Sequence, residues 1–151
     1  GTKHAERSDD TESLMSRPLD DIVSEIDCAR ISLIKSDVDG FDYDVIDSAE
    51  KTITENNCLV YFECQHENSD QFNGYQNCLN RMRKLGYNRF ALFDNFGGLV
   101  AGSVSIDMVF DLMNYVHKQN NTSSFRTIFY LDILAYKPTH ESLVSAVLSE
   151  Y

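Results

Sequence analysis

The chain has 151 residues, of which 42% are hydrophobic and 11% aromatic, which fits one globular domain and excludes the disordered and fibrous classes. Because 13 Lys and Arg residues stand against 24 Asp and Glu residues, with no basic stripe, the composition disfavours tight unaided binding to nucleic acid, and we expect no nucleic-acid partner. The apolar runs are shorter than the ~18 residues of a membrane span and no signal-peptide pattern opens the chain, so we expect a cytoplasmic protein without a membrane span.

The first third of the chain predicts a tail followed by a helix and a strand. Residues 1–16 are polar and lack a period, so we expect a flexible tail and then a single α/β domain over residues 17–151. Segment 17–26 places apolar residues at helical spacing, with acidic residues in its first turns, which predicts a short helix. Residues 31–36 are typical of a buried strand, and Gly40 marks the turn that follows it.

Beyond Gly40 the apolar residues fall four apart, as on one face of a helix that runs to about residue 55. The remaining elements alternate in the same way between buried strands and amphipathic helices. They are a strand at 58–64, a helix around 75–85, a strand at 89–94, a turn at 95–98, a helix through 106–116, a loop at 118–124, a strand at 127–136 and a helix at 143–148. This alternation predicts an α/β fold with a mostly parallel sheet, an antiparallel strand near the C-terminus, and helices on both faces.

The four cysteines indicate neither a disulfide framework nor a metal site. They stand at positions 28, 58, 64 and 78, and no two of them form a C-x-x-C pair. Cys58 and Cys64 lie within or beside one predicted strand. We therefore expect free, buried thiols in a reducing compartment.

The stretch DVDGFDYD, residues 37–44, is the clearest candidate site, and several interpretations of it stay open. An EF-hand calcium loop needs its glycine at the sixth position, whereas Gly40 is fourth, and the twelfth position is Ser48, which has no carboxylate. A glycosyltransferase D-x-D motif would use Asp37 and Asp39 to hold a divalent metal against a nucleotide sugar. The acids also suit a ligand cleft, or caps for the helix that follows.

The place of these acids in the fold favours a cleft. In open α/β sheets, ligands bind outside the carboxyl ends of the strands, and both Asp37 and Glu63 follow such ends. The residues expected together at this rim are Asp37, Asp39, Glu63 and His66. A carboxylate there orients a hydroxyl or takes its proton, and His66, with an unperturbed pKa of about 6.5, suits base chemistry near neutral pH.

Residues 17–53 resemble the FkbM family of S-adenosylmethionine-dependent methyltransferases. The family pattern is approximately T-L-D-D, then I-x-L-I-K-I-D-V-E-G-x-E, then V-L-x-G-A, and these parts stand here as RPLDD, ISLIKSDVDGFD and VIDSA. The strand LVYFEC, residues 59–64, fits the next strand of the family, which also tends to end in Glu. The sequence departs from the pattern at Ser36, Asp39, Asp42 and Ser48.

This resemblance implies a class I methyltransferase with a Rossmann-like sheet. It implies methyl transfer from S-adenosylmethionine to a hydroxyl, such as one on a sugar or glycolipid, without a metal. The resemblance implies that the catalytic residues on the acceptor side are Asp37, Asp39, Glu63 and His66. It also implies that Asp37 and Val38 contact the cofactor. Because no G-x-G occurs in the sequence, we expect the cofactor-binding half to be absent and the chain alone to be inactive.

Without a cofactor-binding half, the strand at 31–36 becomes an exposed sheet edge with unpaired N–H and C=O groups. We expect an upstream half, a partner chain, the N-terminal tail or a second copy of the chain to cover this edge. Two other functions stay open. One is a non-catalytic interaction or dimerisation domain that keeps the methyltransferase-like half as a scaffold, and the other is a metal-dependent glycosyltransferase of the D-x-D type.

Overall fold

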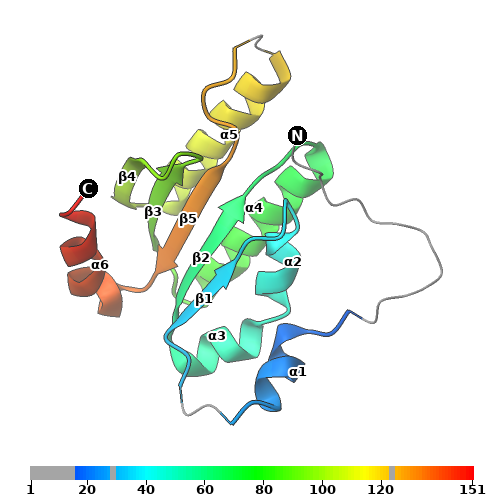
Figure 1. Ribbon diagram of the computed structural model, residues 1–151, viewed down its shortest axis with the longest axis vertical. Coiled ribbons are helices and arrows are strands. Elements are labelled where there is room, and N and C mark those ends of the chain that lie inside the picture. The colour runs from blue at the N-terminus through cyan, green and yellow to red at the C-terminus, as the bar shows by residue number, and fades with distance from the viewer. Residues whose placement is uncertain (1–15, 28–29, 123–124) are drawn as a thin grey trace.

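The computed structural model describes residues 16–27, 30–122 and 125–151 (Figure 1). Most of the expected tail, and Cys28, lie outside these residues. The helices are α1 (Leu19–Ser24), α2 (Asp42–Asp47), α3 (Glu50–Asn56), α4 (Ser69–Lys84), α5 (Ile106–Thr122) and α6 (Glu141–Leu148), the last preceded by a 3-10 turn at Pro138–His140. The strands are β1 (Leu33–Ser36), β2 (Leu59–Cys64), β3 (Arg89–Asp94), β4 (Leu99–Val104) and β5 (Leu131–Tyr136).

The five strands form one mixed sheet in the order β1-β2-β5-β3-β4. Only β1 and β2 pair in parallel, whereas the β2–β5, β5–β3 and β3–β4 pairs are antiparallel. The expected α/β class is confirmed, but the expectation of a mostly parallel sheet is wrong. The physical reason is that β5, the strand expected to run antiparallel, lies between β2 and β3 and reverses both pairings, and that β3 and β4 form a hairpin.

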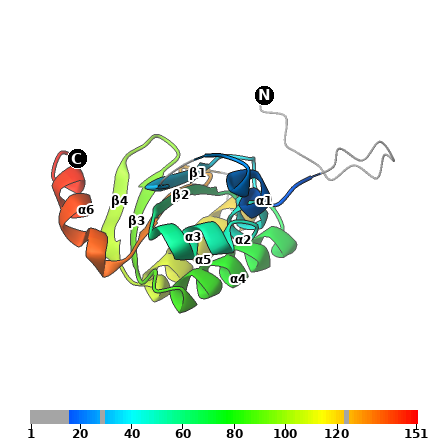
Figure 2. The same cartoon turned by 90° about the horizontal axis from the view of Figure 1, so that it is seen from below.

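Helices α2 to α5 cover one face of the sheet (Figure 2). Side chains alternate between the two faces along each strand, so in β1 Ile34 is buried in this layer while Leu33 is exposed. Helix α4 shows how the sequence builds the layer, because Tyr75, Leu79 and Met82 recur at helical spacing and are all buried. This core fixes the helices against the two strands that carry the predicted site.

Helix α6 covers the part of the opposite face formed by β3 and β5. Its residues Val144 and Leu148 pack against Phe93 and Tyr136, which lie on β3 and β5. At the other end of the sheet, β1 pairs with β2 alone among the described residues, so the strand expected to form a sheet edge does so there. Leu33 of β1 is 52% exposed on this face.

The helix expected from Gly40 to residue 55 is in fact two helices, α2 and α3. The first turn of α3 is stabilised by a residue of α1. The carboxylate of Asp20 accepts hydrogen bonds from the backbone N–H groups of Lys51 (3.0 Å) and Thr52 (2.8 Å). These are two of the four N–H groups that the first turn of a helix leaves without a partner. The side chain of Asp20 thus fixes α1 to α3, a contact between residues about thirty positions apart that periodicity does not reveal.

The loop expected at 118–124 is helical as far as Thr122, because α5 continues beyond its apolar stripe. Its last residues are tied to the segment before β5: the side chain of Gln119 donates to the carbonyl of Ile128 at 2.8 Å, and that of Asn120 to the carbonyl of Phe129 at 2.8 Å. That same segment shortens the strand expected from residue 127, which begins at Leu131. These hydrogen bonds stabilise a polar turn of helix that the sequence pattern does not favour.

Three cysteines are buried free thiols, as expected: Cys58, Cys64 and Cys78. Burial raises the pKa of all three, so their sulfurs stay protonated and pack as small apolar groups. In the described part of the chain, every helix is too short or too polar to cross a membrane.

Candidate functional site

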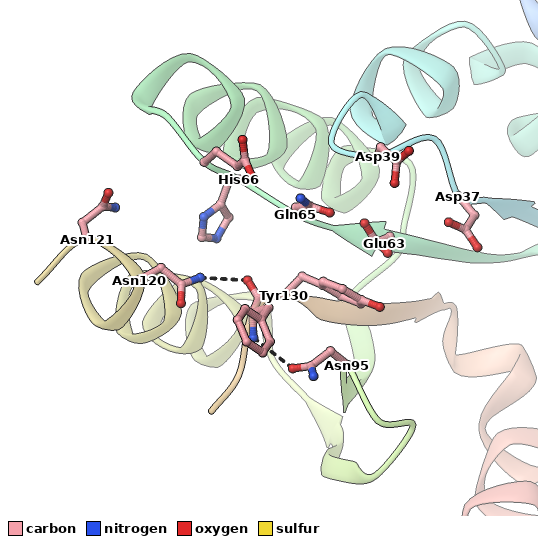
Figure 3. Close-up of a pocket in the computed structure, with 11 residues that line it drawn as sticks. Asp37, Asp39, Glu63, Gln65, His66, Asn95, Asn120, Asn121 and Tyr130 are labelled. Carbon is pink, nitrogen blue, oxygen red and sulfur yellow. Dashed lines mark hydrogen bonds between the residues drawn. The ribbon is translucent and has the colours of Figure 1, made fainter. Parts of the chain in front are cut away.

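Two carboxylates meet at the carboxyl ends of β1 and β2. The strands are parallel and Ser36 pairs with Phe62, so the residues that follow, Asp37 and Glu63, lie side by side at one edge of the sheet. Both line the same cavity, as Figure 3 shows. The expectation that these two acids face a common cleft from neighbouring strands is therefore confirmed.

The cavity has a volume of about 640 Å³ and its two ends differ in chemistry. The carboxylates of Asp37, Asp39 and Glu63 gather at one end, whereas Asn120 and Asn121 stand at the other, at the end of α5 (Figure 3). The remaining lining residues are Gln65, His66, Glu67, Asn95, Phe129 and Tyr130. The four predicted catalytic residues are thus brought together in one cavity, and their roles stay predictions.

A tight turn directs the first two acids into the cavity. Asp39 has φ of +51° and Gly40 has φ of +89°, both in the left-handed region that favours glycine. A Cβ atom on Gly40 would lie 2.7 Å from the side-chain nitrogen of Gln71 and 3.2 Å from the backbone oxygen of Gln65. Only a glycine fits at this close approach, so the turn is held against the loop after β2.

Asp42 is fully buried beneath this turn and holds it in place. Its carboxylate accepts hydrogen bonds from the hydroxyls of Ser36 (2.6 Å) and Tyr75 (3.3 Å), which join the end of β1 to α4. Burial raises the pKa of Asp42, and the Ser36 hydroxyl opposes that rise. The sequence places Asp42 at a helix start within the family pattern, but its burial and its hydrogen bonds were not predicted.

The second half of the chain supplies the other wall of the cavity. The backbone N–H of Phe129 donates to the side-chain oxygen of Asn95 at 2.9 Å, and its carbonyl accepts from Asn120 at 2.8 Å (Figure 3). Phe129 is thereby held between the β3–β4 turn and the end of α5, and the residue is 47% exposed. None of these residues, nor Tyr130, was predicted for the site. The only signal was the paired asparagines at 120 and 121, in a segment expected to be a loop.

Glu63 is buried and incompletely hydrogen-bonded. The residue is only 8% exposed, and its Oε1 atom has no hydrogen-bond partner among the described residues. Burial, together with the smaller effect of the charges of Asp37 and Asp42, raises the pKa of this carboxyl to about 7. Asp132 lies directly opposite on β5 and acts in the same direction. A carboxyl with this pKa exchanges its proton at neutral pH, which suits general acid or base chemistry.

His66 does not titrate near neutral pH. The residue is 3% exposed, and its ring centroid lies 5.1 Å from that of Phe72 and 5.3 Å from that of His117. Burial lowers the pKa of the imidazole to about 4, with a smaller contribution from His117. The unperturbed value assumed from the sequence therefore does not apply, and the ring is neutral at pH 7. Its Nδ1 atom has no hydrogen-bond partner in the described structure.

The remaining predicted contact, Val38, is not among the cavity-lining residues and is 40% exposed. Asp37 is exposed on its outer side, where Lys35 forms an ion pair with it at 3.4 Å. A metal site of the D-x-D type needs further ligands beside Asp37 and Asp39. Within residues 16–27, 30–122 and 125–151, no group of three or more His, Cys, Asp or Glu side chains is placed to hold a metal ion.

Comparison with known proteins places this geometry in a family. The family model described as "Methyltransferase FkbM domain" matches residues 2–89, which is more than half of the chain. Neither a curated protein nor a solved structure matches the chain. The matched region includes both strand ends that carry Asp37, Asp39, Glu63 and His66. The chain therefore belongs to the FkbM methyltransferase family.

Proposed function

We propose that this chain carries the acceptor side of a methyltransferase site that transfers a methyl group from S-adenosylmethionine to a hydroxyl. The observation that supports this proposal is the position of Glu63. Within a chain of the FkbM methyltransferase family, a carboxyl with a pKa of about 7 lies in a polar cavity next to Asp37 and Asp39. An acceptor hydroxyl needs a group of this kind to take its proton.

The charge of the cavity lining is complementary to that of the cofactor. S-adenosylmethionine, when bound, supplies an electrophilic methyl group on a positively charged sulfur. Among the residues that the structure describes, the cavity lining contains four carboxylates and no Lys or Arg, so its field favours a positively charged group. In this proposal Asp37 faces both the cofactor and the acceptor, and its neighbour Val38 lies on the cofactor side, because both residues follow β1, whose outer edge is open in the described structure.

The residues of this chain then position the acceptor and remove its proton. Asp39 accepts a hydrogen bond from a hydroxyl of the acceptor, and its left-handed backbone holds the carboxylate in place for that purpose. Glu63 takes the proton of the reacting hydroxyl as general base. His66 is neutral and contacts the acceptor through its unpartnered Nδ1 atom. The many acceptor atoms of the lining suit a carbohydrate-type substrate, such as a sugar or glycolipid.

A second segment is needed to complete the cofactor site in this proposal, because the sequence contains no glycine-rich G-x-G turn. The edge of β1 offers unpaired backbone groups to which a further strand can pair. We assign this edge to an upstream half, to a partner chain or to a second copy of the chain.

Binding of S-adenosylhomocysteine, the demethylated product, tests the proposal. Nuclear magnetic resonance detects weak binding by the chain alone, and we expect shifts in the backbone amides of residues 37–40 and 63–66. Asp37→Asn should weaken these shifts. Asp107→Asn is the matched control and should leave them unchanged, because Asp107 lies in the first turn of α5, about 20 Å along the helix from Asn120 at the cavity. Absence of the shifts contradicts the cofactor side of the proposal. Micromolar affinity shows instead that the chain needs no second segment.

The exposed edge of β1 favours a second candidate function, that of an interaction domain. Leu33 on the same strand is 52% exposed, so both the backbone and the side chains of β1 are available to a partner. The mass of the particle in solution, measured by size-exclusion chromatography with light scattering at several protein concentrations, tests whether two copies pair. A strict monomer at every concentration contradicts dimerisation through β1.

A further inference from the structure

Two residues of the cavity wall carry buried hydrogen-bond acceptors that have no partner among the described residues. They are the Oε1 atom of Glu63 and the Oδ1 atom of Asn120, whose side-chain nitrogen is already used to hold Phe129. A buried acceptor without a donor costs free energy, so such atoms are usually satisfied by a ligand, an ion or water. These two acceptors come from opposite ends of the cavity (Figure 3). A ligand that satisfies both must carry hydrogen-bond donors at two separate points.

The charge of the lining selects among donor-bearing ligands. The carboxylates of Asp37, Asp39, Glu63 and Glu67 line the cavity, and no described Lys or Arg does so. Lys35 is paired with the outer side of Asp37. An anionic ligand such as a phosphate or carboxylate is therefore repelled, and a cationic one is attracted. A metal ion does not fit this need, since the described side chains offer no group of three ligands.

Two aromatic residues line the cavity. Tyr130 lies beside the carboxylates (Figure 3), whereas Phe129, which is 47% exposed, is held by Asn95 and Asn120 toward the other end. Burial raises the pKa of the Tyr130 hydroxyl, and the nearby charge of Glu63 raises it further, which places this ring close to the acidic end. Aromatic faces attract organic cations, and ammonium groups are commonly bound by such rings together with carboxylates. A neutral polyol can donate hydrogen bonds to the same carboxylates, but it gains no charge attraction from them or from the ring.

We propose that the methyl acceptor of this cavity carries a protonated or quaternary amine beside its hydroxyl, as amino alcohols and amino sugars do. The ammonium group contacts the carboxylates of Asp37 and Glu63 and the ring of Tyr130, while a hydroxyl at a distance donates to Asn120. That this ligand is the methyl acceptor rests on the proposed function. That the cavity prefers a cation to a neutral molecule of the same shape does not.

A pair of probes of the same shape isolates the charge. Choline and 3,3-dimethylbutan-1-ol differ in that a quaternary nitrogen replaces a carbon, and both carry one hydroxyl. Each is titrated into the full chain without cofactor, and the backbone amides are followed by nuclear magnetic resonance. We expect choline to shift the amides of residues 37–40, 63–66 and 130, with an affinity at least about tenfold above that of the neutral alcohol.

Variants locate the selectivity. Glu63→Gln and Asp37→Asn should each reduce the preference for choline, whereas Asp107→Asn, on the distant turn of α5, should leave it unchanged; unaltered shifts elsewhere verify that each variant is folded. Equal affinities, a preference for the neutral alcohol, or no choline-induced shift at these amides up to the solubility of the probe overturns the inference. The S-adenosylhomocysteine titration tests the methyl-transfer proposal and the choline titration tests the cation preference. Because the two measurements are separate, failure of one proposal is distinguished from failure of the other.

Discussion

The ionisation of Glu63 makes the stability of the fold depend on pH, and Glu63→Gln tests that dependence. Burial raises the pKa of this carboxyl from 4.5 to about 7. When folding raises the pKa of an acid, the folded state holds its proton more tightly than the unfolded state. The contribution of Glu63 to the free energy of unfolding is therefore highest below pH 4.5, falls as the pH rises from 4.5 to about 7, and stays at its lower level above that.

The expected size of the effect follows from the same two values. A rise from 4.5 to about 7 corresponds to about 3 kcal/mol at 1.36 kcal/mol per pKa unit. The carboxyl faces a cavity that solvent can enter, which screens its charge, so we expect about 2 kcal/mol in practice. Gln has nearly the shape of Glu and no charge. Glu63→Gln should therefore be more stable than the native protein by about 2 kcal/mol at pH 8 and no more stable at pH 4.5.

Urea unfolding followed by circular dichroism at the two pH values measures this difference. Glu55→Gln, which removes an exposed carboxylate of α3 outside the cavity, is the matched control for the loss of one negative charge. If Glu63→Gln changes the free energy of unfolding by the same amount at both pH values, or destabilises the protein at pH 8, the carboxylate is not strained by its surroundings. The assignment of Glu63 as a base near neutral pH then fails.

Three further substitutions test the parts that hold the site. Asp42→Ala leaves two buried hydroxyls without their acceptor and should cost about 2–4 kcal/mol by urea unfolding, whereas Asp42→Asn should cost less than half of that. Gly40→Ala should cost at least about 1 kcal/mol more than Gly97→Ala, because both positions have positive φ but only Gly40 is crowded; equal costs contradict the close approach. Asp20→Ala should lower the melting temperature by about 2–4 °C through loss of the bonds to α3, and no change refutes that contact.

The acidic end of the site could be predicted because it depends on local patterns. A short apolar run that stops at Asp37, followed by Gly40 and a change to helical spacing, marks a strand end and a turn whatever the rest of the chain does. The same holds for the run that ends at Glu63. Since both strands were expected to run in the same direction, their ends had to lie at one edge of the sheet, and the structure places them there.

The asparagine end of the site could not be predicted, because it depends on tertiary contacts. Asn120 reaches the cavity only because α5 continues through a polar turn, and that turn is held by bonds to the segment before β5. The order of the strands in the sheet could not be predicted for the same reason. The spacing of apolar residues predicts that β5 exists, but not which strands it pairs with. The pKa values of Glu63 and His66 moved in opposite directions because both groups are buried, and burial disfavours whichever form is charged.

The position of β5 has a consequence for how the site assembles. β5 is the strand that joins β2 to the β3–β4 hairpin, and its register with β2 brings together Phe62 and Ile133, which are 71 positions apart. Pairings between such distant residues are slow to form, because a long loop must close before any contact compensates for the lost entropy. A chain that ends before Leu131 would keep all of the residues that match the family model and still lack a continuous sheet. Assembly of the two cavity walls thus awaits the C-terminal strand, although the family signature lies wholly upstream of it.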